Sequence, residues 1–204
     1  MEFTTKDHNG LFSLVLYTSL CNMKCYWCHN KKLNTIRERD ENYKKLEYED
    51  IEMAISNNIV DMIILCWGEF LINPIEEIII TINEIRKLNN KALIRIDTNW
   101  TSPEKVKKLI SLWLIDWLWI DIKWPYWERK QRDNINKIIW IKWEDYFDKI
   151  IETIHLWKEL PHTIYRTVKY PIIKDEEYFT EIERYIKENI KKPYLLNNYI
   201  KINE

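Results

Sequence analysis

Three cysteines within eight residues are the side chains whose types and spacing point most directly to chemistry. Cys21, Cys25 and Cys28 form a C-x3-C-x2-C pattern in a chain with four cysteines. Thiolates on one loop commonly share one inorganic centre. A structural zinc site takes four protein ligands, and iron–sulfur clusters are also normally held by four thiolates. Only three thiolates are at hand here, so a cubane held by them would keep one iron open for a non-protein ligand.

Two other uses of these cysteines stay open on the sequence alone. His29 could complete a zinc site, but it directly follows Cys28, and adjacent side chains are difficult to direct at one tetrahedral ion. The cysteines could also be unligated core residues, although free cysteines are usually buried singly. The fourth cysteine, Cys66, ends an apolar run and is interpreted as a buried strand residue, not as a cluster ligand.

Six short apolar segments, separated by amphipathic ones, are the predicted strands that would carry this loop. They cover residues 11–17, 60–66, 92–97, 116–122, 162–168 and 194–200, and the predicted helices cover residues 48–57, 74–88, 103–112, 144–160 and 175–190. Alternating strands and helices favour a parallel sheet with right-handed crossovers. Six strands are too few for a closed eight-stranded barrel. We therefore predict an α/β fold, a parallel partial (βα)6 barrel, with residues 1–204 as a single domain.

Polar side chains suited to chemistry follow the carboxyl ends of these strands. Cys21 follows the first predicted strand, Glu69 the second, Asp97 ends the third, Asp121 ends the fourth, and Arg166 lies near the end of the fifth. Parallel α/β folds place their active sites at this edge of the sheet. The sequence therefore predicts one site that gathers these side chains.

The segments at the strand ends resemble those of a known enzyme family. The third cysteine begins Cys28-His29-Asn30, and residues 66–70 read Cys-Trp-Gly-Glu-Phe. Residues 97–100 read Asp-Thr-Asn-Trp, and residues 121–125 read Asp-Ile-Lys-Trp-Pro. Over residues 9–171 the chain is similar to the radical S-adenosylmethionine (SAM) superfamily and, within it, to the glycyl-radical-enzyme activating proteins. The greatest resemblance is to the activating protein of anaerobic ribonucleoside-triphosphate reductase, with the activating enzyme of pyruvate formate-lyase nearby.

The resemblance implies a role for each matching residue. Cys21, Cys25 and Cys28 would hold the [4Fe-4S] cluster, and the amino and carboxylate groups of SAM would chelate its fourth iron. The other residues would contact parts of SAM or a monovalent cation beside it. They are Trp67, Gly68 and Glu69 for the methionine part and its ammonium group, Trp27 for the adenine, Lys123 for SAM, Arg166 for the SAM carboxylate, Asp97, Thr98 and Asp121 for the cation, and Asn99 in the same segment.

The resemblance also implies an activity and partners. A flavodoxin- or ferredoxin-type reductant would supply one electron, SAM would be cleaved reductively, and the resulting 5′-deoxyadenosyl radical would take a hydrogen from a glycine Cα of a partner enzyme. The first candidate partner is anaerobic ribonucleoside-triphosphate reductase, and the alternative is pyruvate formate-lyase or another glycyl radical enzyme. Two further interpretations are a radical SAM enzyme acting on a small molecule, which the short chain disfavours, and a zinc-binding interaction module without turnover.

Composition and charge narrow the cellular setting. A formal net charge of −1 gives no global field that would draw the chain to nucleic acid or a membrane. No apolar run approaches the length of a membrane span, and residues 1–9 contain no signal-peptide core. Four cysteines, three of them clustered, do not resemble a secreted disulfide framework. We therefore expect a cytoplasmic protein that binds neither nucleic acid nor membrane.

The numbers of glycine and tryptophan are unusual. The chain contains 2 glycines and 11 tryptophans, together 13, whereas average usage predicts about 14 glycines in a chain of this length. Several tryptophans also stand where a turn favours glycine, as in Asn99-Trp100-Thr101 and before Pro125. Our hypothesis is that UGA codons meaning glycine were translated as tryptophan; a genuinely tryptophan-rich chain is the alternative. The suspect positions are Trp27, Trp67, Trp100, Trp113, Trp117, Trp119 and Trp124.

Overall fold

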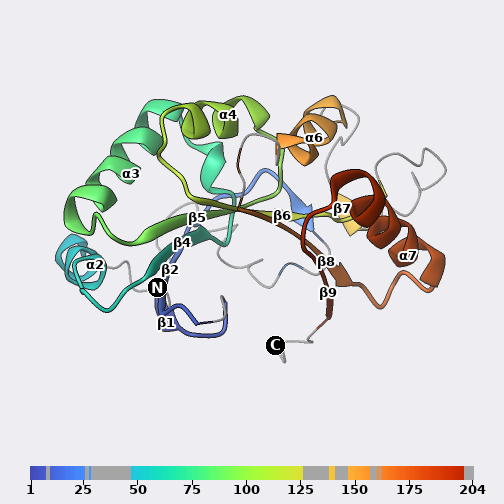
Figure 1. The fold of residues 1–204 in the computed structure, drawn as a ribbon, viewed down its shortest axis with the longest axis horizontal. Coiled ribbons are helices and arrows are strands. Elements are labelled where there is room, and N and C mark those ends of the chain that lie inside the picture. Colours follow the sequence, from blue (N-terminus) through green and yellow to red (C-terminus); the bar gives the residue numbers. More distant parts are fainter. Residues whose placement is uncertain are drawn as a thin grey trace.

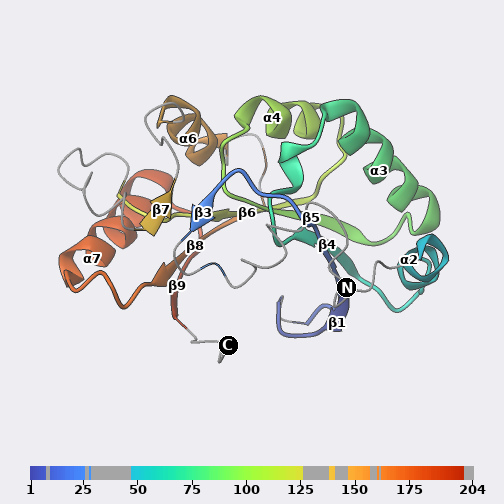
Figure 2. The same ribbon diagram turned by 180° about the vertical axis from the view of Figure 1, so that it is seen from behind.

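The computed structural model describes residues 1–7, 10–25, 28, 47–125, 138–140, 147–156, 160 and 162–199. A curved sheet runs through the molecule, and helices follow one side of it as an arc (Figure 1). Seen from behind, the same arc of helices covers that side of the sheet (Figure 2). The described part of the chain contains no helix long and apolar enough to cross a membrane.

Seven strands form the main sheet in the order β1-β2-β4-β5-β6-β8-β9. Strand β1 pairs antiparallel with β2, and each later pair is parallel. The sheet therefore contains six parallel strands, which confirms the predicted partial (βα)6 barrel. The bounds of its strands are β1 Glu2–Thr4, β2 Ser13–Tyr17, β4 Met62–Cys66, β5 Leu93–Thr98, β6 Trp117–Asp121, β8 Thr163–Lys169 and β9 Tyr194–Asn198.

The helices fall between the strands, as a right-handed βα alternation requires. Within the described residues, all six parallel strands and five helices lie inside or close to the predicted segments. The helix that was predicted to begin at Pro74 starts one residue later, with Pro74 at its N-cap. The helices are α2 Tyr48–Ile55, α3 Ile75–Leu88, α4 Pro103–Ser111, α6 Phe147–Ile154 and α7 Glu176–Tyr185, which continues as a π-helix over Ile186–Ile190, and a 3-10 turn covers Phe70–Ile72.

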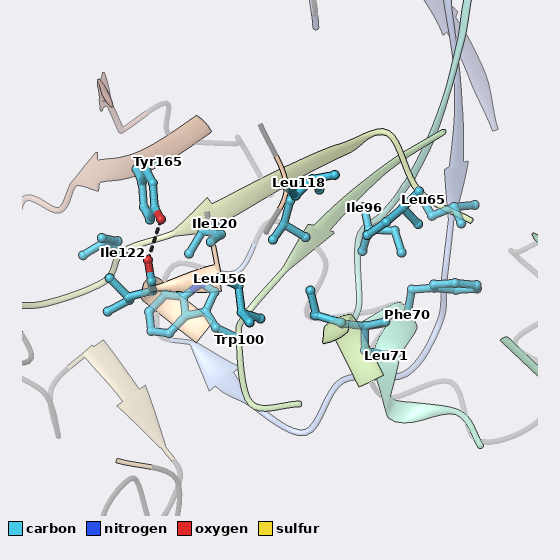
Figure 3. Close-up of a cluster of buried hydrophobic side chains, with 14 of the residues drawn as sticks. Leu65, Phe70, Leu71, Ile96, Trp100, Leu118, Ile120, Ile122, Leu156 and Tyr165 are labelled. Carbon is cyan, nitrogen blue, oxygen red and sulfur yellow. Dashed lines mark hydrogen bonds between the residues drawn. The ribbon is translucent and has the colours of Figure 1, made fainter. Parts of the chain in front are cut away.

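The main core lies between the helices and one face of the sheet. Side chains alternate between the two faces of a strand, and those that face the helices are aliphatic residues of neighbouring strands. Figure 3 shows Leu65, Ile96, Leu118 and Ile120 packed together with Trp100. On the opposite face, Met62, Ile64 and Cys66 form a separate small cluster with Val15. The strands are thus apolar on both faces near their middles, as expected for buried parallel strands.

A second, two-stranded sheet was not predicted. Strand β3, Lys24–Cys25, lies inside the cysteine loop and pairs antiparallel with β7, Ile139–Trp140. Strands of two residues give no periodic pattern, so sequence reasoning had no signal for them. The pairing matters because it ties the loop that carries the cysteines to a segment more than one hundred residues later.

Candidate active site

A cavity of about 750 Å³ lies at the carboxyl ends of the parallel strands. Its walls come from loops and strands that are far apart in the sequence, and they include nearly all of the predicted site residues. Those that line it are Cys21, Cys25, Cys28, Trp67, Gly68, Asp97, Thr98, Asn99, Asp121, Lys123 and Arg166. Glu69 lies behind this wall, bonded to Thr98 and Asn99. Trp27 lies outside the described residues.

The three motif cysteines are reduced in this structure and face the same cavity. The Cys21 sulfur accepts hydrogen bonds from the Met23 backbone N–H at 3.4 Å and from the Asn99 side-chain amide at 3.6 Å. Burial raises the pKa of Cys21 to about 11, and burial also raises the pKa of Cys25. As thiolates, these groups therefore need a cationic centre to offset their burial.

This donor set fits an iron–sulfur cluster. Cysteine thiolates are the usual ligands of such clusters, and hydrogen bonds to the sulfurs tune them. Among the described side chains, no three Cys, His, Asp or Glu residues converge as ligands of one single metal ion. The thiols of Cys21, Cys25 and Cys28 instead line a larger shared space. Cys66 is buried at the end of β4, as predicted, although its side chain also reaches the cavity wall.

A chain of amides connects the cysteine loop to the end of β5. The Asn99 side chain donates to the Asn22 oxygen at 2.8 Å, and the Asn22 side chain donates to the Thr101 hydroxyl at 2.9 Å. The Thr101 hydroxyl in turn donates to the Asn99 oxygen at 2.9 Å. Because each amide is held at both ends, Asn99 fixes the position of the Cys21 sulfur relative to the sheet.

Glu69 is a buried carboxylate held by three donors. One of its oxygens accepts from the Thr98 hydroxyl at 2.9 Å and the Leu71 backbone N–H at 3.2 Å, and the other accepts from the Asn99 backbone N–H at 2.6 Å. Its exposed fraction is 1%. Burial raises the pKa of Glu69 to about 7, and the hydrogen bonds from Asn99 and Thr98 oppose that shift. A positive charge near this carboxyl, such as that of Lys123, therefore favours its ionised form.

Gly68 allows the loop that carries Glu69 to pass close to the end of β2. Its φ of +85° lies in the left-handed region, and a Cβ here would lie 2.6 Å from the carbonyl oxygens of Thr18 and Leu20. The Glu69 N–H donates to the same Leu20 carbonyl at 2.6 Å. No L side chain fits this position without moving backbone, so glycine is required here.

Charged side chains of β5, β6 and β8, together with Lys123 just after β6, form a network of ion pairs across the cavity floor. Arg166 donates from Nε to Asp121 at 2.6 Å, and another guanidinium nitrogen lies 3.8 Å from Asp97. Lys123 lies 3.4 Å from the second oxygen of Asp121. Burial alone would raise the pKa of Asp121, but the charges of Arg166 and Lys123 outweigh it and lower the value to about 2. Asp121 is therefore ionised at neutral pH.

Arg95 belongs to this network of ion pairs and was missed by the sequence reasoning. Its Nε and one terminal nitrogen bind the two oxygens of Asp97 at 2.8 and 3.3 Å, and its other nitrogen donates to the Asp7 carbonyl at 3.0 Å. The guanidinium carbon lies 3.8 Å from the ring centre of Trp119. A usable signal was present, because residues two apart on a strand share a face, and Arg95 precedes Asp97 by two.

Comparison with known proteins gives consistent results. The model of the radical SAM superfamily matches residues 15–188. A protein of Methanocaldococcus jannaschii, named provisionally as a glycyl-radical enzyme activating enzyme, is 28% identical over 192 residues, which are 92% of this chain and 74% of that protein.

Solved structures of anSMEcpe have a similar fold. One with bound AdoMet and a peptide has a TM-score of 0.66 and 18% identity, over 93% of this chain and 51% of that one. Another with bound AdoMet has a TM-score of 0.65 and 18% identity, over 93% of this chain and 52% of that one. The chain thus spans about half the length of these structures, and the likeness shows the fold.

The superfamily match runs from Val15 in β2 past the end of β8, so it includes the cysteine loop and every described wall of the cavity except its two terminal segments. The chain is therefore an enzyme of the radical SAM superfamily, whose cofactors are a [4Fe-4S] cluster and SAM.

Proposed function

We propose that this enzyme activates a glycyl radical enzyme, and that its partner is anaerobic ribonucleoside-triphosphate reductase. The observation that carries the proposal is the similarity to the Methanocaldococcus jannaschii protein. The similarity extends over 92% of the chain, and the name of that protein includes the activating function. The motifs at the strand ends support it, since they resemble those of activating proteins beyond the cysteine pattern common to the superfamily.

Each residue of the cavity would have a defined task. Cys21, Cys25 and Cys28 would hold the cluster, and Glu69 would bind the ammonium group of SAM, whose positive charge offsets the burial of the carboxylate. Arg166 and Lys123 are the cations on the cavity wall suited to the carboxylate of SAM, Arg166 through a two-point match. When bound, the cluster and SAM supply a carbon-centred radical by one-electron cleavage of SAM.

The monovalent cation implied by the resemblance would compete with a side chain. Asp97 and Asp121 would be its carboxylate ligands, but here Arg166 lies against both. A cation that binds these oxygens would release the guanidinium toward the cavity, where the SAM carboxylate is expected. We therefore expect SAM affinity to rise with a suitable monovalent salt, and we expect this dependence to disappear in Asp121→Asn.

A protein substrate must bring its glycine to the cavity. In the described part of the chain, the sheet ends at β1 on one side and β9 on the other and does not close. Residues 196–199 at the end of β9 line the cavity. An open edge of this kind would let a loop of the partner enter beside β9. A cluster sensitive to oxygen also fits the reducing cytoplasm, with a flavodoxin- or ferredoxin-type electron donor.

The test is glycyl radical formation on purified partner enzymes. Cluster-loaded protein, SAM and a chemical reductant are mixed anaerobically with anaerobic ribonucleoside-triphosphate reductase or with pyruvate formate-lyase, and the radical is measured by electron paramagnetic resonance. We expect 5′-deoxyadenosine in both mixtures and a glycyl radical on the reductase alone. A radical on pyruvate formate-lyase alone would refute the reductase as the partner and identify pyruvate formate-lyase instead. SAM cleavage without a radical on either enzyme would refute the activating function. Cys21→Ala is the matched inactive control.

A further inference from the structure

We propose that residues 67, 100 and 113 are glycine in the protein that the source organism makes, because it reads their UGA codons as glycine. Among the described residues, four side chains other than glycine stand at left-handed backbone positions: Trp67 at φ 56°, Trp100 at 65°, Trp113 at 56° and Lys191 at 57°. Three of the four are tryptophan, which makes up 11 of the 204 residues. A bulky side chain in this conformation is a genuine outlier, whereas glycine adopts it freely.

Trp113 occupies a helix-ending position that glycine normally fills. Helix α4 ends at Ser111, and Leu112 is its C-cap. The Trp113 N–H donates to the Ile110 carbonyl at 2.9 Å, and the Leu114 N–H donates to the Leu109 carbonyl at 3.1 Å. These are the two bonds of the Schellman motif, whose left-handed residue is usually glycine. The indole is 90% exposed, so packing gives no reason for tryptophan here.

Trp100 combines a left-handed backbone with a completely buried indole. Its N–H donates to the Thr98 hydroxyl at 3.1 Å, and its carbonyl accepts from the Thr153 hydroxyl at 2.8 Å. These bonds fix the turn after β5, so the backbone cannot relax toward negative φ without losing them. The indole packs against Trp124, with ring centres 5.8 Å apart. Figure 3 shows Trp100 among its core neighbours.

Trp67 stands beside Gly68, so two consecutive residues have positive φ. Its carbonyl accepts from both the N–H and the hydroxyl of Thr18, at 2.9 and 2.6 Å. The indole stacks on Tyr17 with ring centres 4.5 Å apart and forms part of the cavity wall. A glycine at this position would relieve the backbone and remove the indole from the cavity.

Composition supports the same conclusion independently. The chain has 2 glycines, far below the roughly 14 that average usage predicts, and 11 tryptophans. Reading one codon differently removes both anomalies together. Lys191 shows that the left-handed region is not closed to other residues at a helix end, so the argument depends on the three tryptophans and the composition together.

Mass spectrometry of the protein isolated from its source cells is the direct test. Trypsin releases residues 96–105, which contain position 100 and no other tryptophan, and residues 109–123, which contain position 113. We expect glycine at positions 67, 100 and 113, together with UGA in the gene at each. Tryptophan in the native peptides at these positions would overturn the proposal.

A stability comparison tests the backbone argument without the source organism. We expect Trp113→Gly to raise the melting temperature by about 2–4 °C, because it removes one strained residue from a chain of this size. The matched control is the neighbouring Leu112→Gly, also exposed but at φ −94°, which should lower it. A drop in melting temperature for Trp113→Gly comparable to that of the control would contradict the argument. Neither measurement depends on activity, so both are independent of the proposed function.

Discussion

The titration of Glu69 gives a quantitative test of how the cavity is built. Burial raises the pKa of this carboxyl from 4.5 to about 7, and each pKa unit corresponds to about 1.4 kcal/mol. The unfolded chain ionises near pH 4.5, while the folded chain keeps the proton until about pH 7. The folded state therefore binds more protons between these values, and its stability falls as the pH rises through this window.

The size of the effect follows from the two pKa values. Between pH 5.5 and 8, Glu69 should lower the free energy of unfolding by about 2 kcal/mol, out of roughly 3 kcal/mol over the whole window. Glu69→Gln cannot ionise, so this pH dependence should disappear. The amide also lacks one acceptor for the donors at Thr98 and Asn99, which costs about 1–3 kcal/mol at every pH. The change in the free energy of unfolding with pH is therefore diagnostic, and the constant difference between the two proteins is not.

The measurement is urea unfolding of the cluster-free, reduced protein at several pH values from 5.5 to 8. Cys21, with a pKa of about 11, does not titrate in this range. The control variant is Glu188→Gln, which removes an exposed carboxylate and should keep the wild-type slope. Parallel profiles for the wild type and Glu69→Gln would show that the buried carboxyl does not titrate near neutral pH and would refute the reasoning.

Three further changes probe separate parts of the site. Alanine at any of the three motif cysteines should abolish the brown colour of reconstituted protein and its SAM cleavage, whereas Cys66→Ala should keep both; a colourless Cys66→Ala protein would make it a ligand. Gly68→Ala puts a Cβ 2.6 Å from two carbonyl oxygens, so SAM binding measured by equilibrium dialysis should fall at least tenfold, and unchanged affinity would show that the loop can shift. Asp121→Asn leaves the Arg166 guanidinium without its partner at 2.6 Å and should cost about 1–3 kcal/mol in urea unfolding at pH 7. Because the pKa of Asp121 falls from 3.8 to about 2, this difference should shrink as the pH falls through that window, and a constant difference would argue against the ion pair.

The order of strands and the residues at their carboxyl ends could be predicted from the sequence. Apolar runs such as Met62–Cys66 are distinct because both faces of a parallel strand are buried. Once the strands are parallel, Glu69, Asp97 and Asp121 must share one edge of the sheet. Spacing and topology therefore predict that these side chains lie together.

The pairing of charges inside the site could not be predicted in the same way. Arg166 lies opposite Asp121 because the register of β6 and β8 aligns these two residues. The sequence contains no information on register that is independent of the fold, since strand ends are uncertain by a residue or more. For the same reason the β3–β7 pairing, which anchors Cys25, has no local signal.

The three carboxylates of the site, Asp97, Asp121 and Glu69, differ in the charge of their partners. Each carboxylate on the cavity floor already has a guanidinium partner, Asp97 through Arg95 and Asp121 through Arg166. Glu69 has only neutral donors among its hydrogen-bond partners, and its pKa is the one that burial raises to about 7. Burial also raises the pKa of Asp97, although the charges of Arg95 and Arg166 oppose that shift, so a new cation close to Glu69 or Asp97 would favour the ionised carboxylate. Arg166 is shared between two carboxylates and can turn one of its nitrogens toward an anion without leaving either unpaired, because Arg95 and Lys123 stay in place. Under the proposed function, the ammonium group and the carboxylate of SAM would therefore have different partners in the site, Glu69 and Arg166.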